Sequence, residues 1–185
     1  MRIVGGEFRG RAIAAPAGEA IRPTSDRLRQ TIFDILAHAH GDPVRGARVL
    51  DLFAGTGALG LEAMSRGATY ALFVEEAVAA RGLIRRNVEA LGLTGRTRIY
   101  RRDATRLGPI GNLAPFAVVF ADPPYGRGLG EKAVAAAVAG GWLAPGAIVV
   151  LEESAATEVT PIPALTVDET RRVGDSQVVF LRALP

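Results

Sequence analysis

The stretch Val49–Gly60, VLDLFAGTGALG, decides the fold of this chain. It begins with the apolar residues of a buried strand, passes through a turn of the form Gly55-x-Gly57-x-x-Gly60, and continues with a helical pattern. Glycines permit a tight turn and a close approach of backbone to a ligand, and the helix start behind them offers free N–H groups. The stretch therefore predicts a strand, a ligand-binding loop and a helix.

Strand and helix patterns alternate along the chain from Ala47 onward. The predicted strands span residues 47–52, 70–74, 96–100, 116–121 and 147–151. The predicted helices span residues 58–66, 77–91 and 129–140, with a short turn near 104–108. Two final segments, 165–173 and 176–184, flank Gly174-Asp175 and predict an antiparallel hairpin. This order is typical of an α/β fold with a parallel sheet, whose ligand site lies at the carboxyl ends of the strands.

Residues 1–40 precede this pattern and are predicted to extend a domain that spans 41–185. Short apolar pieces around glycines predict a small β-hairpin at the start. Apolar residues at helical spacing then predict a helix over 26–39, with Thr24 or Ser25 as its N-cap.

The composition is that of an ordinary globular domain, with 49% hydrophobic and 22% charged residues in 185. There are no cysteines and two histidines, so we expect no disulfide and no metal site. The start of the chain lacks the apolar core of a signal peptide. Glycine and proline interrupt the uncharged run Ala133–Leu151, which favours a helix followed by a strand over a membrane span. These features favour a cytoplasmic protein.

The arginines are concentrated at the start of the chain. Residues 1–30 hold six arginines and three acids, so this segment carries a net charge of +3, equal to that of the whole chain. Such an arm suits a phosphate backbone, although a solvated edge has the same composition. Charge alone leaves both interpretations open.

Two acids distinguish between possible ligands of the glycine loop. Glu75 ends the second predicted strand, twenty residues after Gly55, where an acid can bind ribose hydroxyls. Asp51 precedes Gly55 by four residues, and its charge would repel a pyrophosphate but attract a cation. S-adenosylmethionine carries a sulfonium and an ammonium and has no phosphate. The pair therefore favours this cofactor, unless Asp51 is a turn or cap carboxylate.

The predicted strand 116–121 ends in Asp122-Pro123-Pro124-Tyr125. The prolines stop the strand and fix the backbone. The Asp122 side chain and the Pro123 carbonyl then offer two acceptors for the hydrogens of an exocyclic amine, and Tyr125 offers a face on which a base can stack. The motif predicts methylation of a nucleobase amine, with the base extruded from its stack. Its alternative is a strand end that merely packs.

Four motifs resemble those of class I methyltransferases, in the same order: VLDLFAGTGALG (49–60), FVEE (73–76), RDA (102–104) and ADPPY (121–125). The resemblance implies a Rossmann-like seven-stranded sheet and S-adenosylmethionine as the cofactor. It implies that Asp51 serves the methionyl end, Glu75 the ribose and Asp103 the adenine edge, unless Asp103 only caps a helix. The full set of cofactor residues implied is Thr24, Asp51, Ala54, Gly55, Gly57, Glu75, Glu76, Asp103 and Ala104.

The N-terminal segments MRIVGGEFRGRAIAAP and IRPTSDRLRQTIFDIL are similar to those of the bacterial RsmD family, which methylates the exocyclic N2 amine of one guanine in 16S ribosomal RNA. This resemblance implies catalytic roles for Asp122, Pro123 and Tyr125. It implies RNA-binding roles for Arg2, Arg9, Arg11, Arg22 and Arg27. Two of these arginines have alternative roles. Arg22 and Arg27 can bind the methionyl carboxylate together with Thr24, or Arg27 can pair with Asp34.

The expected partner is ribosomal RNA, within a small ribosomal subunit or its assembly intermediate, and we expect a monomer without a metal. Another base, such as adenine in rRNA or DNA, is the alternative substrate. Outside this reaction class, a nicotinamide-dependent oxidoreductase uses a similar glycine loop, although Asp51 argues against it. A module that binds cofactor and RNA without catalysis is a third hypothesis.

Overall fold

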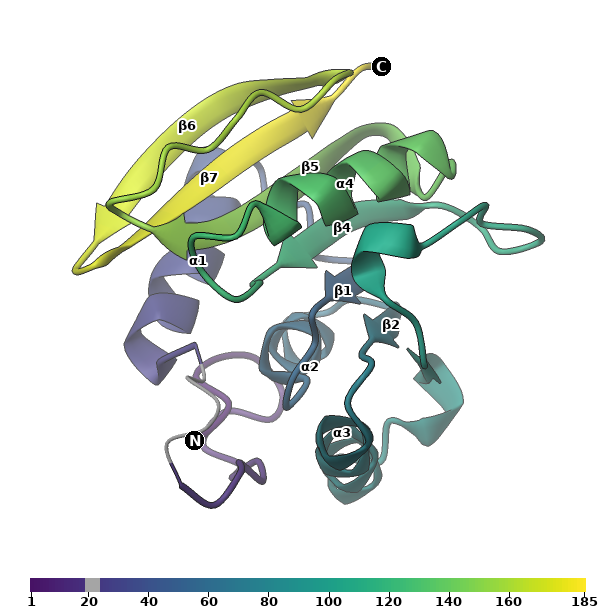
Figure 1. Ribbon diagram of the computed structural model, residues 1–185. Coiled ribbons are helices and arrows are strands. Elements are labelled where there is room, and N and C mark those ends of the chain that lie inside the picture. Colours follow the sequence, from purple (N-terminus) through teal and green to yellow (C-terminus); the bar gives the residue numbers. More distant parts are fainter. Residues whose placement is uncertain (19–23) are drawn as a thin grey trace.

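The computed structural model describes residues 1–18 and 24–185 and contains a seven-stranded sheet with helices on both faces (Figure 1). The α-helices are α1 (Asp26–Ala39), α2 (Ala58–Ser65), α3 (Val78–Ala90) and α4 (Leu129–Ala139). Two 3-10 turns are η1 (Thr94–Arg96) and η2 (Ala104–Arg106). The strands are β1 (Arg48–Leu52), β2 (Tyr70–Val74), β3 (Thr97–Tyr100), β4 (Phe116–Ala121), β5 (Leu143–Ser154), β6 (Leu165–Val173) and β7 (Ser176–Ala183).

The strand order in the sheet is β3-β2-β1-β4-β5-β7-β6. The first five of these strands pair in parallel, whereas β7 runs antiparallel to both β5 and β6. Because β1 and β4 lie side by side at the centre, the loops that follow them open at the same edge. The predicted seven-stranded α/β sheet with its C-terminal antiparallel hairpin is confirmed.

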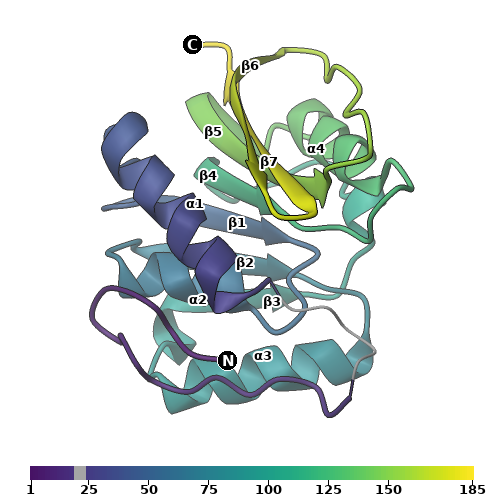
Figure 2. The same cartoon turned by 90° about the vertical axis from the view of Figure 1, so that its left-hand side faces the viewer.

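Two apolar cores cover the two faces of the sheet, and Figure 2 shows α1 and α4 on opposite sides of it. On one face, Phe33 of α1 and Ile84 of α3 pack with Phe73 and Phe120 of the sheet. On the other face, Trp142 is fully buried in the core that includes α4. Strands buried on both faces explain why their sequences are nearly continuous apolar runs.

The run Ala133–Leu151 forms most of α4 and the first part of β5, as its glycine and proline interruptions predict. β5 begins at Leu143, earlier than the predicted 147, because Leu143 pairs with Phe116 before a register shift. In the described ranges 1–18 and 24–185, no helix is long and apolar enough to cross a bilayer.

The predicted N-terminal hairpin consists of two segments joined by one antiparallel bridge, between Arg2 and Ala12. Side chains of α2 and α3 hold this segment by its backbone. The Glu62 carboxylate accepts the N–H groups of Val4 and Gly5, at 3.0 and 2.8 Å, and Asn87 binds both backbone groups of Ala14, at 2.7 and 3.1 Å. The segment is therefore held against α2 and α3, with Ile3 and Ile13 buried, rather than projecting from the molecule.

The first turn of α1 is capped by Ser25, whose hydroxyl accepts the Leu28 N–H at 3.1 Å. Of the two predicted caps, Ser25 is thus the one used. The other, Thr24, directs its side chain to the candidate site described below.

Candidate active site

A cavity of about 900 Å³ opens at the carboxyl ends of the strands. This volume lies within the range of small-ligand pockets. Its walls come from the start of α1, the glycine loop with the end of β2, the loop after β4, β5, and the turn between β6 and β7. The lining residues are Thr24, Ser25, Arg27, Leu28, Phe53, Gly55, Glu75, Ala77, Ala80, Asp122, Pro123, Pro124, Tyr125, Glu152, Val173, Gly174, Asp175 and Ser176.

The glycine loop has the geometry that its sequence predicts. Gly55 and Gly57 have φ angles of 57° and 82°, in the left-handed region that favours glycine. The Glu75 carboxylate accepts the Gly55 N–H at 2.9 Å and the Ala77 N–H at 2.9 Å. Glu75 thus braces the loop while it lines the cavity, which is where a ribose-binding acid is needed.

Asp51 lies beneath the loop, 1% exposed, and accepts the Gly60 N–H at 3.0 Å. Burial raises the pKa of Asp51 to about 8; the Gly60 hydrogen bond opposes this shift, and the charge of Glu75 adds to it. Asp51 is not part of the cavity wall. It acts here as a turn carboxylate, and a role at the methionyl end stays a prediction.

Asp103 caps η2. Its carboxylate accepts the N–H and the hydroxyl of Thr105, at 2.9 and 2.7 Å, and these bonds lower the pKa of Asp103. Several other predicted cofactor residues also lie outside the cavity wall: Ala54, Gly57, Glu76 and Ala104. For Asp103 the helix-cap alternative is the one seen, and contact with adenine stays a prediction.

The loop after β4 brings the predicted catalytic residues to the cavity. Asp122 accepts a hydrogen bond from the Thr24 hydroxyl at 2.5 Å. Burial and the neighbouring charge of Glu152 raise the pKa of Asp122 well above its usual range. The side chains of Thr24 and Asp122 thereby join the start of α1 to the end of β4.

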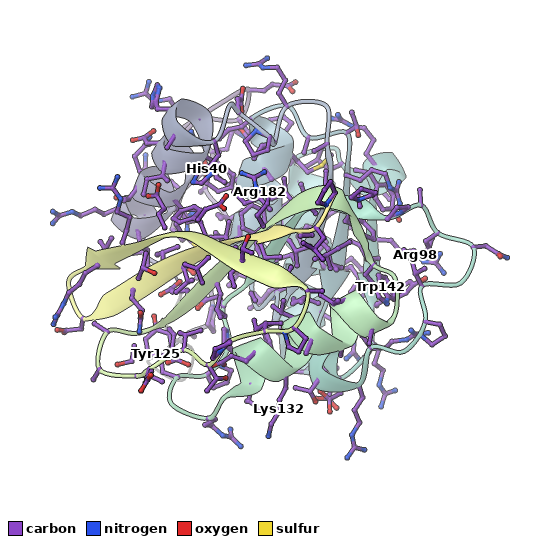
Figure 3. The ribbon with its side chains drawn as sticks, turned by 90° about the horizontal axis from the view of Figure 1, so that it is seen from above. His40, Arg98, Tyr125, Lys132, Trp142 and Arg182 are labelled. Atoms are coloured by element: carbon purple, nitrogen blue, oxygen red, sulfur yellow. The ribbon has the colours of Figure 1, made fainter. Side chains whose placement is uncertain are left out.

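Tyr125 is held by its hydroxyl, which donates to Glu152 and lies 3.0 Å from the Ser176 hydroxyl. Burial and the hydrogen bond to Glu152 raise the pKa of Tyr125. Figure 3 shows Tyr125 beside the turn of the β6–β7 hairpin. An anchored hydroxyl restricts the ring, and a fixed ring is a better stacking surface because less side-chain entropy is lost on binding.

Sequence reasoning missed Glu152 and the turn 173–176, although both line the cavity. A signal for Glu152 was present, since the acids of VVLEES follow an apolar run, at the strand end where the site was expected. The turn was predicted as part of a hairpin, but its place above the site depends on the insertion of β7 beside β5.

The predicted RNA-binding arginines have different surroundings. Arg27 lines the cavity, while Asp34, its alternative partner, accepts a hydrogen bond from Gln30 at 2.6 Å. Arg2 and Arg9 are exposed, and exposed Arg11 donates to the Ala90 carbonyl at 2.7 Å. Arg22 lies outside the described residues.

Within the described part of the chain, no group of three His, Cys, Asp or Glu side chains is placed to hold a metal ion.

Comparison with known proteins identifies close relatives. The model of the family described as conserved hypothetical protein 95 matches residues 1–182. The chain is 38% identical over 165 residues to ribosomal RNA small subunit methyltransferase D of Escherichia coli K12, covering 89% of this chain and 80% of that protein.

Among solved structures, the putative methyltransferase yhhF from Escherichia coli superposes with a TM-score of 0.84 and 33% identity, covering 100% of this chain and 98% of the other. The Thermus thermophilus 16S rRNA N2 G1207 methyltransferase RsmC, in complex with AdoMet and guanosine, gives a TM-score of 0.67 and 26% identity. That match covers 86% of this chain and 43% of the other.

Proposed function

The chain belongs to the family described as conserved hypothetical protein 95, the RsmD family. On that premise we propose that it methylates the exocyclic amine of a guanine in small-subunit ribosomal RNA, with S-adenosylmethionine as the methyl donor. The curated relative from Escherichia coli is named a ribosomal RNA small subunit methyltransferase, and the structural relative RsmC is a 16S rRNA N2 G1207 methyltransferase in complex with AdoMet and guanosine.

The residues present fit S-adenosylmethionine. The loop has two glycines in left-handed conformations, so its backbone can approach a ligand closely, and Glu75 at its side supplies carboxylate oxygens to the cavity. The cavity of about 900 Å³ has room for the cofactor and a base together. When bound, S-adenosylmethionine supplies a methyl group on a positively charged sulfur, an electrophile that needs no strong base before attack.

The single observation that carries the proposal is the position of Asp122 and Pro123 at the cavity, on a backbone fixed by two prolines. Both hydrogens of an exocyclic amine can bond to acceptors there, the Asp122 carboxylate and the Pro123 carbonyl. This pairing draws the nitrogen toward tetrahedral geometry and aims its lone pair, so that orientation and electrostatics carry the catalysis. Tyr125, anchored by Glu152, provides the stacking face.

The proposal extends to the RNA-binding surface and the substrate. The exposed Arg2, Arg9 and Arg11 are the proposed contacts to RNA phosphates, together with Arg22, and Arg27 faces the cavity. We propose residues 1–40 as the RNA-directed part and 41–185 as the methyltransferase domain. The proposed substrate is a small subunit or its assembly intermediate, bound by a monomer, and a ribosomal substrate supports a cytoplasmic location.

Replacement of Asp122 by alanine tests the proposal. Transfer of labelled methyl to 16S rRNA should fall by about a hundredfold or more, as when an oriented hydrogen-bonding group is removed from an active site. S-adenosylmethionine affinity, measured by calorimetry, should change little. Asp34→Ala is the matched control, because Asp34 bonds Gln30 on α1 and lies outside the cavity wall. Unchanged turnover in Asp122→Ala would rule out the role of the Asp-Pro-Pro-Tyr loop.

A nicotinamide-dependent oxidoreductase is excluded by the same calorimetry if S-adenosylmethionine binds and NAD does not. Tight binding of NAD alone would instead favour that alternative.

A further inference from the structure

Glu152 lines the cavity, and the proposed chemistry gives it no contact with the substrate, only the anchoring of Tyr125. It lies on β5, is 4% exposed, and lines the cavity beside the loop that follows β4. Burying a carboxylate costs folding free energy unless the group is paired or hydrogen-bonded, so the partners of each Glu152 oxygen are important.

The sheet register places Glu152 next to Asp122. β4 pairs with β5 in parallel, and Ala121 lies opposite Leu151 at the end of the ladder. The next residues are Asp122, directly after β4, and Glu152 on β5, and the charge of Glu152 adds to burial in raising the pKa of Asp122. Two acceptors thus stand side by side at the cavity.

One oxygen of Glu152 lacks a partner. Oε1 accepts the hydroxyl of Tyr125, whereas Oε2 is buried and has no hydrogen-bond partner among the described residues. Two adjoining buried carboxyl groups are hard to ionise together, and N–H donors supplied by a ligand favour their ionised forms. The site therefore calls for a ligand with two neighbouring N–H donors.

Guanine has this arrangement. On its Watson–Crick edge the N1–H donor adjoins the N2 amine, so one donor can face each carboxylate. Adenine and cytosine have an exocyclic amine too, but the neighbouring ring nitrogen is an acceptor that would meet the carboxylate oxygen with its lone pair. Extruded bases are read along this same edge by nucleobase-modifying enzymes.

We propose that Glu152 is the residue that selects guanine, its Oε2 accepting the N1–H while Asp122 and Pro123 hold the N2 amine. The inference rests on the proposed methyl transfer and names the group that sets its base specificity. The Tyr125 hydroxyl fixes the other oxygen and so aims Oε2. When an analogue leaves buried polar groups of a site without hydrogen-bond partners, its kcat/KM can be lower than that of the true substrate by a large factor.

The test replaces the target guanine of a 16S rRNA fragment with 2-aminopurine, which keeps the reacting 2-amine and lacks the N1–H. The wild type should prefer guanine strongly, as measured by kcat/KM. In Glu152→Gln the amide can donate to N1 of 2-aminopurine, so the preference for guanine should fall at least tenfold. 2-Aminopurine also lacks O6, but this affects the wild type and the variant alike. Comparing the guanine to 2-aminopurine ratio of kcat/KM between the two enzymes therefore cancels the effect.

Glu153→Gln is the matched control. Glu153 is also buried, with an Oε2 that is unpartnered among the described residues, but its Oε1 accepts the N–H groups of Gly126 and Ser154, and it does not line the cavity. The Glu153→Gln variant should prefer guanine over 2-aminopurine as strongly as the wild type does. An equal loss on both substrates in Glu152→Gln would overturn the proposal and leave Glu152 as a support for Tyr125.

A second measurement uses only the wild type and does not depend on the folding of a variant. RNA with 1-methylguanine at the target keeps the N2 amine but lacks the N1–H, and it should not be methylated. Methylation at the rate of the guanine RNA would overturn the role of Glu152. If the guanine RNA itself were not methylated, the proposed function would fail instead, so the two failures are distinguishable.

Discussion

Thr24 and Asp122 are joined by a hydrogen bond of 2.5 Å, although 98 positions separate them in the chain. Thr24 directly precedes the cap of α1, and Asp122 directly follows β4. The bond links the segment proposed to meet RNA with the loop proposed to orient the amine, and it lowers the pKa of Asp122 against the effects of burial and Glu152.

Thr24→Val should shift the pH dependence of methyl transfer to higher pH. Without the hydroxyl, the pKa of Asp122 rises further, and the ionised acceptor forms only at higher pH. A hydrogen bond to a charged group contributes about 1.5–3 kcal/mol, so the midpoint of kcat should move by about one to two pH units. Thr24→Ser keeps the donor and should restore the wild-type midpoint. Equal midpoints for Thr24→Val and wild type would contradict this role.

Asp51→Asn should remove a pH dependence of stability. The pKa of Asp51 is about 8 in the folded state against 3.8 ordinarily, so the unfolded chain releases this proton first and stability falls as pH rises through that window. Asparagine keeps an oxygen for the Gly60 N–H and does not titrate. Denaturant unfolding near the two ends of this pH window should show a smaller loss of unfolding free energy in the variant than in the wild type. Parallel pH profiles would contradict the shift.

Gly60→Ala should destabilise the protein because neighbouring atoms occupy the space that a side chain needs. A Cβ at this position would lie 2.5 Å from Phe73 Cε1 and 3.2 Å from Asp51 Oδ2. Overpacking of this kind costs about 1–3 kcal/mol in unfolding free energy. Gly82→Ala in α3 is the control with the opposite sign, since its Cβ meets no described atom within 4 Å and alanine favours a helix by about 0.5–1 kcal/mol. Similar effects at both positions would contradict the steric account.

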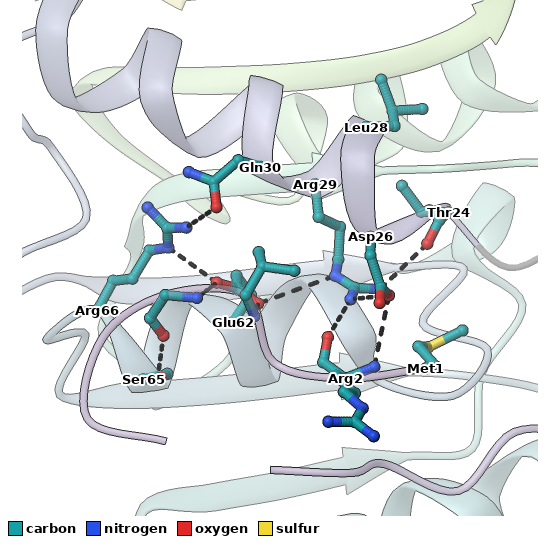
Figure 4. A network of polar contacts seen from close by, with 12 residues as sticks. Met1, Arg2, Thr24, Asp26, Leu28, Arg29, Gln30, Glu62, Ser65 and Arg66 are labelled. Atoms are coloured by element: carbon teal, nitrogen blue, oxygen red, sulfur yellow. Dashed lines mark hydrogen bonds and ion pairs between the residues drawn. The ribbon is translucent and has the colours of Figure 1, made fainter. Parts of the chain in front are cut away.

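Glu62→Gln should release the N-terminal segment. Figure 4 shows Glu62 between Arg66, at 2.9 Å, and Arg29, at 3.8 Å, and both Arg29 and Glu62 have fully buried side chains. The substitution leaves Arg29 paired with Asp26 alone, at 2.7 Å, and turns an amide N–H toward donors that Glu62 now accepts, so it should cost about 1–3 kcal/mol. Chemical denaturation measures the loss, and limited proteolysis should cut within residues 1–14. Glu89→Gln, at an exposed position on α3, is the control. Wild-type stability in Glu62→Gln would show that the network is dispensable.

Charge reversal of Arg9 and Arg11 should weaken RNA binding in a salt-dependent way. For each arginine that no longer neutralises a phosphate, the slope of log affinity against log salt should decrease by about one. Arg45→Glu is the control, because Arg45 is exposed and its ion pair with Asp42 lies in the loop before β1. Unchanged RNA affinity in the double variant would mean that the arm is structural, as the Arg11 bond to Ala90 would then suggest.

The local part of the site was predictable and the long-range part was not. Glu75 follows from strand order and spacing, because parallel strands end at one edge. Glu152 and Ser176 meet Tyr125 only through the pairing of β5 with β7, which no local pattern specifies. Asp103 shows a different difficulty. Its carboxylate accepts the N–H and the hydroxyl of Thr105 in a short turn, and no sequence periodicity distinguishes this capping role from a ligand-binding role.

The insertion of β7 between β5 and β6 also sets the order in which the site can be completed during synthesis. The start of α1, the glycine loop and the loop after β4 emerge from the ribosome before Ser176 and its neighbours in the cavity wall. A nascent chain that has reached β6 still lacks the strand that joins β6 to the sheet and the hydroxyl that holds Tyr125. An enzyme proposed to modify ribosomes would thus gain its complete cavity only after its own β7 has been synthesised.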